Sequence, residues 1–146
     1  MNKKLFIIIG KPNSHKSSVM RCLTGCRDKK NNWKLSMIGG DEIFYIKTSS
    51  PQEQSRLGIT PQQMVDFLLL LKESNIMLAL QSNSVSLQPN GNIYLREFIK
   101  AGFDIQDIVS FDEHAELENL KYHFFDTNTE TSNATASKVR KIWNII

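Results

Sequence analysis

Two runs of apolar residues stand out in the pattern of hydrophobic and polar positions along this chain. Leu5–Ile9 is apolar throughout and is followed by Gly10, and Asn75–Leu80 is apolar after its first residue. A continuous apolar run of this length, bounded by turn residues, is typical of a strand buried on both faces of a parallel or mixed sheet. The pattern therefore predicts two central strands.

Apolar residues at helical spacing occur between and after these strands. Thr60 is a predicted N-cap, because Pro61 takes the first helical position and Gln63 completes a capping box. In the same segment, spacings of three and four residues predict a buried stripe formed by Met64, Phe67, Leu68 and Leu71. Further helices are expected over residues 17–23, 93–101 and 135–146, with Gly25 and Gly102 ending the first two.

Shorter β-rich runs complete the pattern. Trp33–Ile38 and Ile43–Lys47 flank Gly39–Glu42 and predict an antiparallel hairpin, preceded by a polar turn over residues 27–32. Short strands are expected over 108–111 and 122–125, with a short helix over 112–120 between them. Strands thus alternate with helices apart from the hairpin. The chain is therefore predicted to be a single α/β domain, residues 1–146, with three α/β/α layers and a mostly parallel sheet.

Composition excludes several classes of protein. The 146 residues are 40% hydrophobic and 23% charged, close to globular averages, which excludes a disordered chain, a coiled coil and a disulfide scaffold. The net charge of +3 is too small to indicate a nucleic-acid partner. No apolar run approaches the ~20 residues of a membrane span. Cys22 and Cys26 are expected to pack as free thiols in a reducing, cytoplasmic compartment.

The stretch that carries chemistry is Gly10–Ser18, with the sequence GKPNSHKSS, between a predicted strand and a predicted helix. The phosphate-binding pattern G-x-x-x-x-G-K-[ST] occurs in that same context. Its loop amides and the positive end of the helix dipole face an anion, its lysine reaches the β- and γ-phosphates, and its hydroxyl binds Mg²⁺. We therefore expect a phosphate-binding loop formed by Gly10, Lys11, Pro12, Asn13, Ser14, His15, Lys16, Ser17 and Ser18.

His15 departs from this pattern, because it stands where the pattern has its second glycine. A side chain there adds bulk near the phosphates and meets a backbone conformation that glycine adopts most easily. An imidazole beside a phosphate also offers a hydrogen bond and a positive charge. Two interpretations follow, one in which His15 weakens phosphate binding and one in which it tunes it.

The same stretch, followed by a helix that ends in Leu-Thr-Gly25, resembles the first motif of P-loop GTPases, including translation-factor-related and ribosome-assembly GTPases. The hairpin up to Lys47 is similar to the second and third strands of that fold. The resemblance implies that Gln52 lies near the γ-phosphate and orients a water molecule as a catalytic residue. Lys47 stands in the region of the family's metal-linked aspartate, and the Asn-Lys-x-Asp motif that reads guanine is absent from the sequence.

The C-terminal part resembles a different branch of the P-loop proteins. Tyr122–Asn128, with the sequence YHFFDTN, and the helix after it are similar to the last strand and helix of nucleoside and nucleotide kinases. This resemblance implies that the loop with Asn128 lies near the base of the nucleotide. Asp126 at the strand end is interpreted either as a Mg²⁺ ligand through water or as the cap of the next turn.

Two classes of function remain after these observations. The first is a nucleotide-binding protein that takes ATP or GTP with Mg²⁺ and hydrolyses or transfers phosphate. In this hypothesis Lys16 and Gln52 act in catalysis, and Ser17 and Asp126 hold the metal. The second is a degenerate phosphate-binding domain that serves as a non-catalytic interaction or regulatory module with a protein partner. A small-molecule or nucleotide kinase is a weaker third reading, because no acceptor-binding residues are evident in the sequence.

Overall fold

The structure is a computed structural model, and it describes residues 2–53, 58–83, 87–113, 117 and 120–146. Within these residues the chain forms six strands, four α-helices and one 3₁₀ turn. In chain order they are β1 (Lys4–Gly10), α1 (Lys16–Thr24), β2 (Lys29–Met37), β3 (Gly40–Lys47), the 3₁₀ turn η1 (Pro51–Glu53), α2 (Pro61–Leu70), β4 (Asn75–Gln81), α3 (Gly91–Lys100), β5 (Asp104–Ser110), β6 (His123–Phe124) and α4 (Ser132–Trp143).

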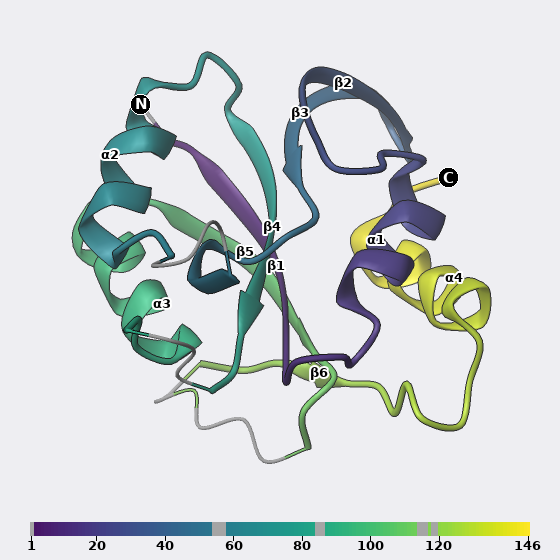
Figure 1. Cartoon of the computed structure of the whole chain (residues 1–146). Helices are drawn as coiled ribbons and strands as arrows, with labels where there is room; N and C mark the ends of the chain where they lie inside the picture. Colours follow the sequence, from purple (N-terminus) through teal and green to yellow (C-terminus); the bar gives the residue numbers. More distant parts are fainter. Residues whose placement is uncertain (1, 54–57, 84–86, 114–116, 118–119) are drawn as a thin grey trace.

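The strands form one sheet in the order β2-β3-β4-β1-β5-β6 (Figure 1). β1 lies between β4 and β5 and is parallel to both, and β3 and β6 extend the parallel part at either side. β2 and β3 form the antiparallel hairpin, with Trp33 opposite Phe44. The predicted α/β class, the mostly parallel sheet and the early hairpin are therefore confirmed.

Helices cover both faces of the sheet, as Figure 1 shows. Alternate residues of β1 point to opposite faces, so Ile8 packs in the core beneath α1 and α4, whereas Ile7 and Ile9 pack beneath α2 and α3. All three side chains are fully buried. This two-sided burial explains why the segment is apolar at every position, and it is compatible with the predicted three-layer architecture.

The ends of the helices follow local rules that the sequence carries. At α2, Gln63 N donates to Thr60 Oγ1 at 3.1 Å and Thr60 N donates to Gln63 Oε1 at 3.0 Å, so the predicted capping box is confirmed. Gly25 ends α1 with φ of 76°, a left-handed conformation that glycine adopts at little cost. These caps set where each helix starts or stops relative to the sheet.

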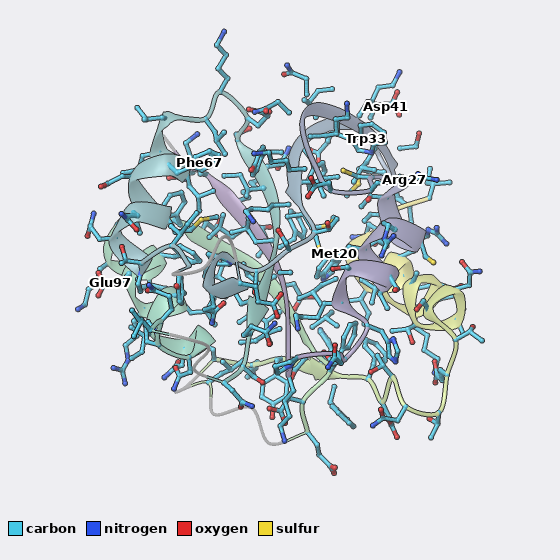
Figure 2. All side chains as sticks on the ribbon, viewed as in Figure 1. Met20, Arg27, Trp33, Asp41, Phe67 and Glu97 are labelled. Atoms are coloured by element: carbon cyan, nitrogen blue, oxygen red, sulfur yellow. The ribbon has the colours of Figure 1, made fainter. Side chains whose placement is uncertain are left out.

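Several predicted boundaries and burial patterns are wrong, and the strand expected over 108–111 spans Asp104–Ser110. The turn expected over 27–32 is strand from Lys29 onward, because β2 continues along β3 past the end of its apolar part. Phe67 is 40% exposed on α2, and Val65 is buried in its place (Figure 2). The last helix ends at Trp143 and not at Ile146, which is 76% exposed. The helix expected over 112–120 lies partly outside the described residues.

Candidate functional site

The Gly10–Ser18 loop lies at the carboxyl edge of the parallel strands. Gly10 O accepts from Ser82 N at 2.9 Å just after β4, and Ile9 O accepts from Phe111 N at 2.8 Å just after β5. The loop therefore stands where three neighbouring parallel strands end. In open α/β sheets this edge is the usual place for a ligand, because loops from several strands converge there.

The loop turns back sharply on itself. A Cβ added at Gly10 would lie 2.5 Å from Ser14 Oγ and 3.2 Å from Phe111 Cβ, so only glycine fits this position without a shift of its neighbours. Ser14 N donates to Lys11 O at 3.2 Å and closes the turn. Ser14 Oγ is buried and has no hydrogen-bond partner. The other predicted loop residues, Lys11 and Pro12, are exposed.

His15 takes a left-handed backbone conformation, with φ of 70° and ψ of 22°. This is the conformation in which glycine replaces most residues, and histidine is one of the few other types enriched there. Asn13 is also left-handed, with φ of 62°. The His15 side chain is exposed, and its carbonyl oxygen accepts from Val19 N at 2.9 Å to start α1. The substitution for glycine therefore leaves the loop open.

Lys16 is buried at the first position of α1 and is only 6% exposed. Its Nζ donates to Gly10 O at 3.2 Å and to Lys11 O at 2.9 Å, which holds the ammonium group across the loop. Burial lowers the pKa of Lys16 to about 8, and the negative charge of Glu53 opposes this shift. At pH 7 the group is still mostly protonated, so a cation is held at the helix N-terminus.

Residues 13–18 of the loop line one side of a cavity of about 300 Å³. Thr48, Ser50 and Glu53 line the other side, because they follow β3 at the same edge of the sheet. Ser17 Oγ donates to Thr48 O at 3.1 Å and joins the two sides. The cavity thus combines hydroxyl groups, a buried ammonium group and a carboxylate.

The opposite side of this cavity comes from the segment that follows β3. Glu53 lines the cavity and also accepts a hydrogen bond from Gln81 Nε2 at the end of β4. Thr48 and Ser50 come directly after a strand, and the convergence of strand ends at one edge was the signal that would have pointed to them. Their distance from Gly10 in the sequence hides this proximity.

Gln52, the predicted catalytic glutamine, is 1% exposed. Its Nε2 donates to Gln81 O at 3.0 Å and to Pro89 O at 3.2 Å, and its Oε1 accepts from Gln81 N at 3.1 Å. The amide therefore bridges η1, the end of β4 and the segment before α3. It is not among the residues that line the loop cavity. These contacts give Gln52 a structural task that occupies both ends of its amide.

The loop after β6 is joined to the Gly10–Ser18 loop by a side-chain hydrogen bond. Thr127 Oγ1 donates to Ser14 O at 2.9 Å, although the two residues are 113 apart in the sequence. Asp126 Oδ1 accepts from Asn128 N at 2.9 Å, which is the turn-capping arrangement. Both Asp126 and Asn128 are exposed and neither lines the loop cavity. The structure thus brings Thr127 to the loop, and not the two predicted ligands beside it.

The donor atoms of the cavity decide which metal it suits. Among the described residues there is no group of three or more histidine, cysteine or acidic side chains that could hold a metal ion. Mg²⁺ does not require one, because it keeps several waters and binds through one or two protein oxygens plus the substrate's phosphates. Ser17 Oγ and the Glu53 carboxylate, which share the cavity, fit that need.

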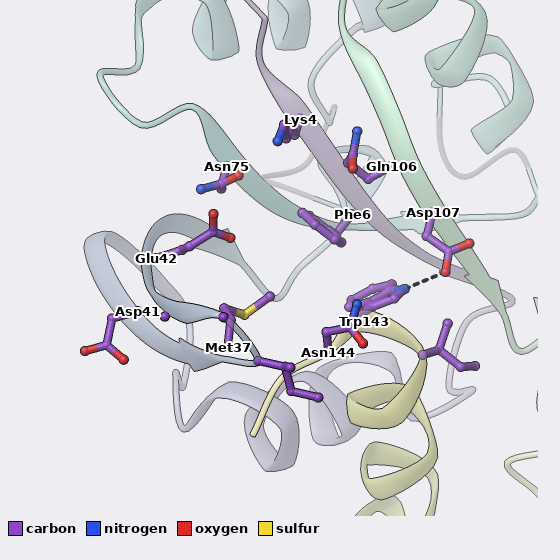
Figure 3. A pocket seen from close by; sticks show the side chains of 14 residues that line it. Lys4, Phe6, Met37, Asp41, Glu42, Asn75, Gln106, Asp107, Trp143 and Asn144 are labelled. Carbon is purple, nitrogen blue, oxygen red and sulfur yellow. Dashed lines mark hydrogen bonds between the residues drawn. The ribbon is translucent and has the colours of Figure 1, made fainter.

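A larger cavity of about 450 Å³ lies at the opposite end of β1, near Lys4 and Phe6. Figure 3 shows Trp143 on its wall, with Nε1 donating to Asp107 Oδ2 at 3.0 Å. His123 Nε2 lies 3.3 Å from the same carboxylate oxygen. This cavity lies at the amino ends of β1 and β4, away from the loops that follow the strands. It is therefore separate from the candidate phosphate site.

Comparisons with protein-family models, with curated proteins and with solved structures found no match to this chain. The chemistry of the site therefore rests on its own residues. In the described part of the chain no helix has the length and apolar character needed to cross a membrane.

Proposed function

We propose that this chain binds the phosphates of a nucleoside triphosphate, ATP or GTP, at the Gly10–Ser18 loop. The observation that carries the proposal is the buried Lys16 ammonium, held across the loop by two carbonyl oxygens at the N-terminus of α1. Burial of a charged group in this way costs free energy unless an anion compensates the charge. The left-handed conformation of His15 supports the proposal, because it gives the backbone the shape that glycine would give it.

The same residues assign a role to each part of the site. Lys16 would donate to the terminal phosphates, the helix dipole and loop amides would stabilise their negative charge, and Ser17, whose hydroxyl donates to Thr48 O in this structure, would hold the metal. Mg²⁺, when bound, neutralises charge on the phosphate oxygens. Glu53 lies opposite, where it attracts a hydrated cation and supports the protonated form of Lys16.

A second candidate function is a nucleotide-binding module that does not hydrolyse its ligand. It is favoured by Gln52, whose amide is engaged at both ends and is absent from the cavity lining. Among the described residues that line the loop cavity, the carboxylate is Glu53, which also accepts from Gln81. Transfer of phosphate to an acceptor remains a prediction from the resemblance to nucleotide kinases.

Equilibrium titration with fluorescent ATP and GTP analogues, with and without Mg²⁺, tests the proposal directly. We expect saturable binding of at least one nucleotide, weaker without the metal, and release by unlabelled nucleotide. Release of inorganic phosphate, measured on the same sample, separates the two candidates, because the non-hydrolysing module binds without turnover. Absence of binding to either nucleotide would refute both.

Nucleotide binding should weaken as pH rises. The pKa of Lys16 is lowered to about 8 by burial, so its protonated fraction falls about tenfold between pH 7 and pH 9. We expect the dissociation constant for ATP or GTP to rise about tenfold over that range. Burial in the folded chain disfavours the protonated form of Lys16, so the free energy of unfolding rises as pH increases from 8 to 10.5. Titration of Lys16 therefore stabilises the fold over this range. A loss of nucleotide binding cannot be caused by unfolding through this group. A flat profile would contradict the assignment.

Substitution of His15 by glycine distinguishes the two interpretations of this residue. Left-handed backbone costs a non-glycine residue about 1 kcal/mol, so the variant should hold the loop with less strain. If His15 is only tolerated, nucleotide affinity should rise by up to about fivefold. If the imidazole contacts phosphate, affinity should instead fall, because a hydrogen bond to the ligand is lost. Isothermal titration of the native chain and the variant decides between them.

A further inference from the structure

A third cavity lies close to the candidate phosphate site, on the α2 side of the sheet. It has a volume of about 380 Å³ and lies between β3 and α2. The segment after β3 separates the two cavities, since Lys47 faces this one while Thr48 and Ser50 face the loop. Its principal lining residues are Lys29, Tyr45, Lys47, Ile59, Met64 and Phe67.

Two lysines stand directly opposite each other at this cavity. Lys29 of β2 pairs with Lys47 of β3 in the antiparallel register, so their side chains share one face of the hairpin. Like charges at such positions repel each other. Lys47 is only 4% exposed, and its Nζ donates to Ser49 O at 3.0 Å and Ser49 Oγ at 2.8 Å. An anion between the two ammonium groups would relieve this repulsion.

Charged groups on both sides act on Lys47. Burial is the main cause that lowers its pKa to about 8, Asp28 and Glu53 oppose this shift, and the positive charge of Lys29 contributes to it. Neither carboxylate lines the cavity. Among the described lining residues, the charged side chains are therefore the two lysines, and Lys47 is mostly protonated at pH 7.

Tyr45 brings an unpaired hydroxyl to the same place. It is 2% exposed, and its Oη is buried without a hydrogen-bond partner. Buried polar groups in proteins nearly always have a partner, so the unpaired hydroxyl of a residue that lines the cavity points to a ligand atom that completes it. Burial raises the pKa of Tyr45 to about 12, with Glu73 and Asp28 adding to the shift, so the hydroxyl keeps its proton and is able to donate.

The remaining wall of the cavity is apolar. The ring of Phe67 packs edge-on against Tyr45 with centroids 5.6 Å apart, and Phe67 itself is 40% exposed (Figure 2). Met64 and Ile59 line the same side. An exposed aromatic ring next to a buried polar group is an arrangement that suits a ligand with one flat apolar part and one polar end.

We propose that this cavity binds a small organic anion with an aromatic body, its carboxylate or phosphate group placed between Lys29, Lys47 and the Tyr45 hydroxyl. The apolar body of the ligand lies against Phe67, Met64 and Ile59. The site uses none of the loop residues that carry nucleotide binding. It is therefore independent of the proposed function and is tested without nucleotide.

Fluorine NMR of small ligands with the full chain measures this binding. The probes are 4-fluorobenzoate, 4-fluorophenyl phosphate and the neutral control 4-fluorobenzyl alcohol, each titrated to about 5 mM so that millimolar dissociation constants are visible. We expect saturable binding of at least one anion and at least tenfold weaker binding of the alcohol. Comparison of the two anions decides between carboxylate and phosphate. Binding of neither anion, or equal binding of the alcohol, would overturn the proposal.

Three variants locate the bound probe. Lys29→Met and Tyr45→Phe should each weaken anion binding about tenfold, whereas Lys30→Met, a neighbouring lysine of β2 that pairs with Ile46 instead, should leave it unchanged. Because its hydroxyl has no partner, Tyr45→Phe should melt no lower than the native chain, so its loss of binding is not unfolding. If Lys29→Met binds normally, the site is wrong.

Lys16→Met separates this site from the phosphate loop. Anion binding should persist in that variant, because Lys16 lines the loop cavity and not this one. Anion binding that disappears with Lys16 would place the probe at the loop and overturn the proposal. Loss of nucleotide binding alone would leave it supported.

Discussion

Lys16→Met should weaken the binding of ATP and GTP about 100-fold. Hydrogen bonds to charged groups contribute about 1.5–3 kcal/mol each, and in the proposed function the Lys16 ammonium, which donates to two loop carbonyl oxygens in this structure, donates to phosphate oxygens, so the loss is expected near 3 kcal/mol. Methionine keeps most of the length and apolar volume of the stem, which limits the damage to packing around a residue that is only 6% exposed. Isothermal titration with each nucleotide and Mg²⁺ measures the change.

Lys3→Met is the matched control. Lys3 lies just before β1 and is 2% exposed, and its Nζ donates to the carbonyl oxygens of Leu71 and Glu73. Both variants therefore remove a buried ammonium group from one end of the same strand. We expect similar changes in melting temperature and an unchanged nucleotide affinity for Lys3→Met. Equal affinities of the two variants would show that Lys16 acts on stability and not on phosphate.

Trp143→Ala should lower the free energy of unfolding by about 3–5 kcal/mol, the range for a large buried aromatic residue replaced by alanine. Trp143 is 3% exposed at the end of α4, and its ring packs edge-on against Phe6 with centroids 5.4 Å apart. Its Nε1 also donates to Asp107 (Figure 3). Removal of the ring detaches α4 from the start of β1. Urea denaturation followed by circular dichroism measures the loss.

Two further variants divide this effect into its parts. Trp143→Phe keeps an aromatic ring but removes the N–H donor, so it should lose only about 1–2 kcal/mol. Trp33→Ala removes the other tryptophan, which is partly buried and donates to Thr24 O at 2.9 Å, and it should cost less than Trp143→Ala. Equal losses for both alanine variants would contradict the assignment of Trp143 to the core.

Local chemistry explains which elements were evident in the sequence. Leu5–Ile9 is apolar at every position because β1 is buried on both faces, and Thr60 with Gln63 forms a capping box through groups three residues apart. Such features depend on neighbours along the chain. The loop from Gly10 to Ser18 was found for the same reason, since its residue types and spacing form one continuous stretch.

Features that depend on distant neighbours were missed or misplaced. Phe67 has the spacing of a buried helical stripe, yet it is 40% exposed. Its ring packs on Tyr45 of β3, and a cavity lies beside the pair. The helix expected over 93–101 begins earlier, at Gly91, where a Cβ would lie 2.6 Å from Gln81 O. In both cases the decisive contact comes from another strand.

The sequence alone determined the alternation of strands and helices, the hairpin and the residues of the candidate phosphate loop. Only the tertiary structure decided that β4 lies between β1 and β3, that Glu53 faces Lys16 across a cavity, and that Gln52 bridges loops instead of facing the phosphate site. Periodicity and capping are set within a few residues, whereas strand order and cavity walls are set by which apolar faces the whole chain buries together.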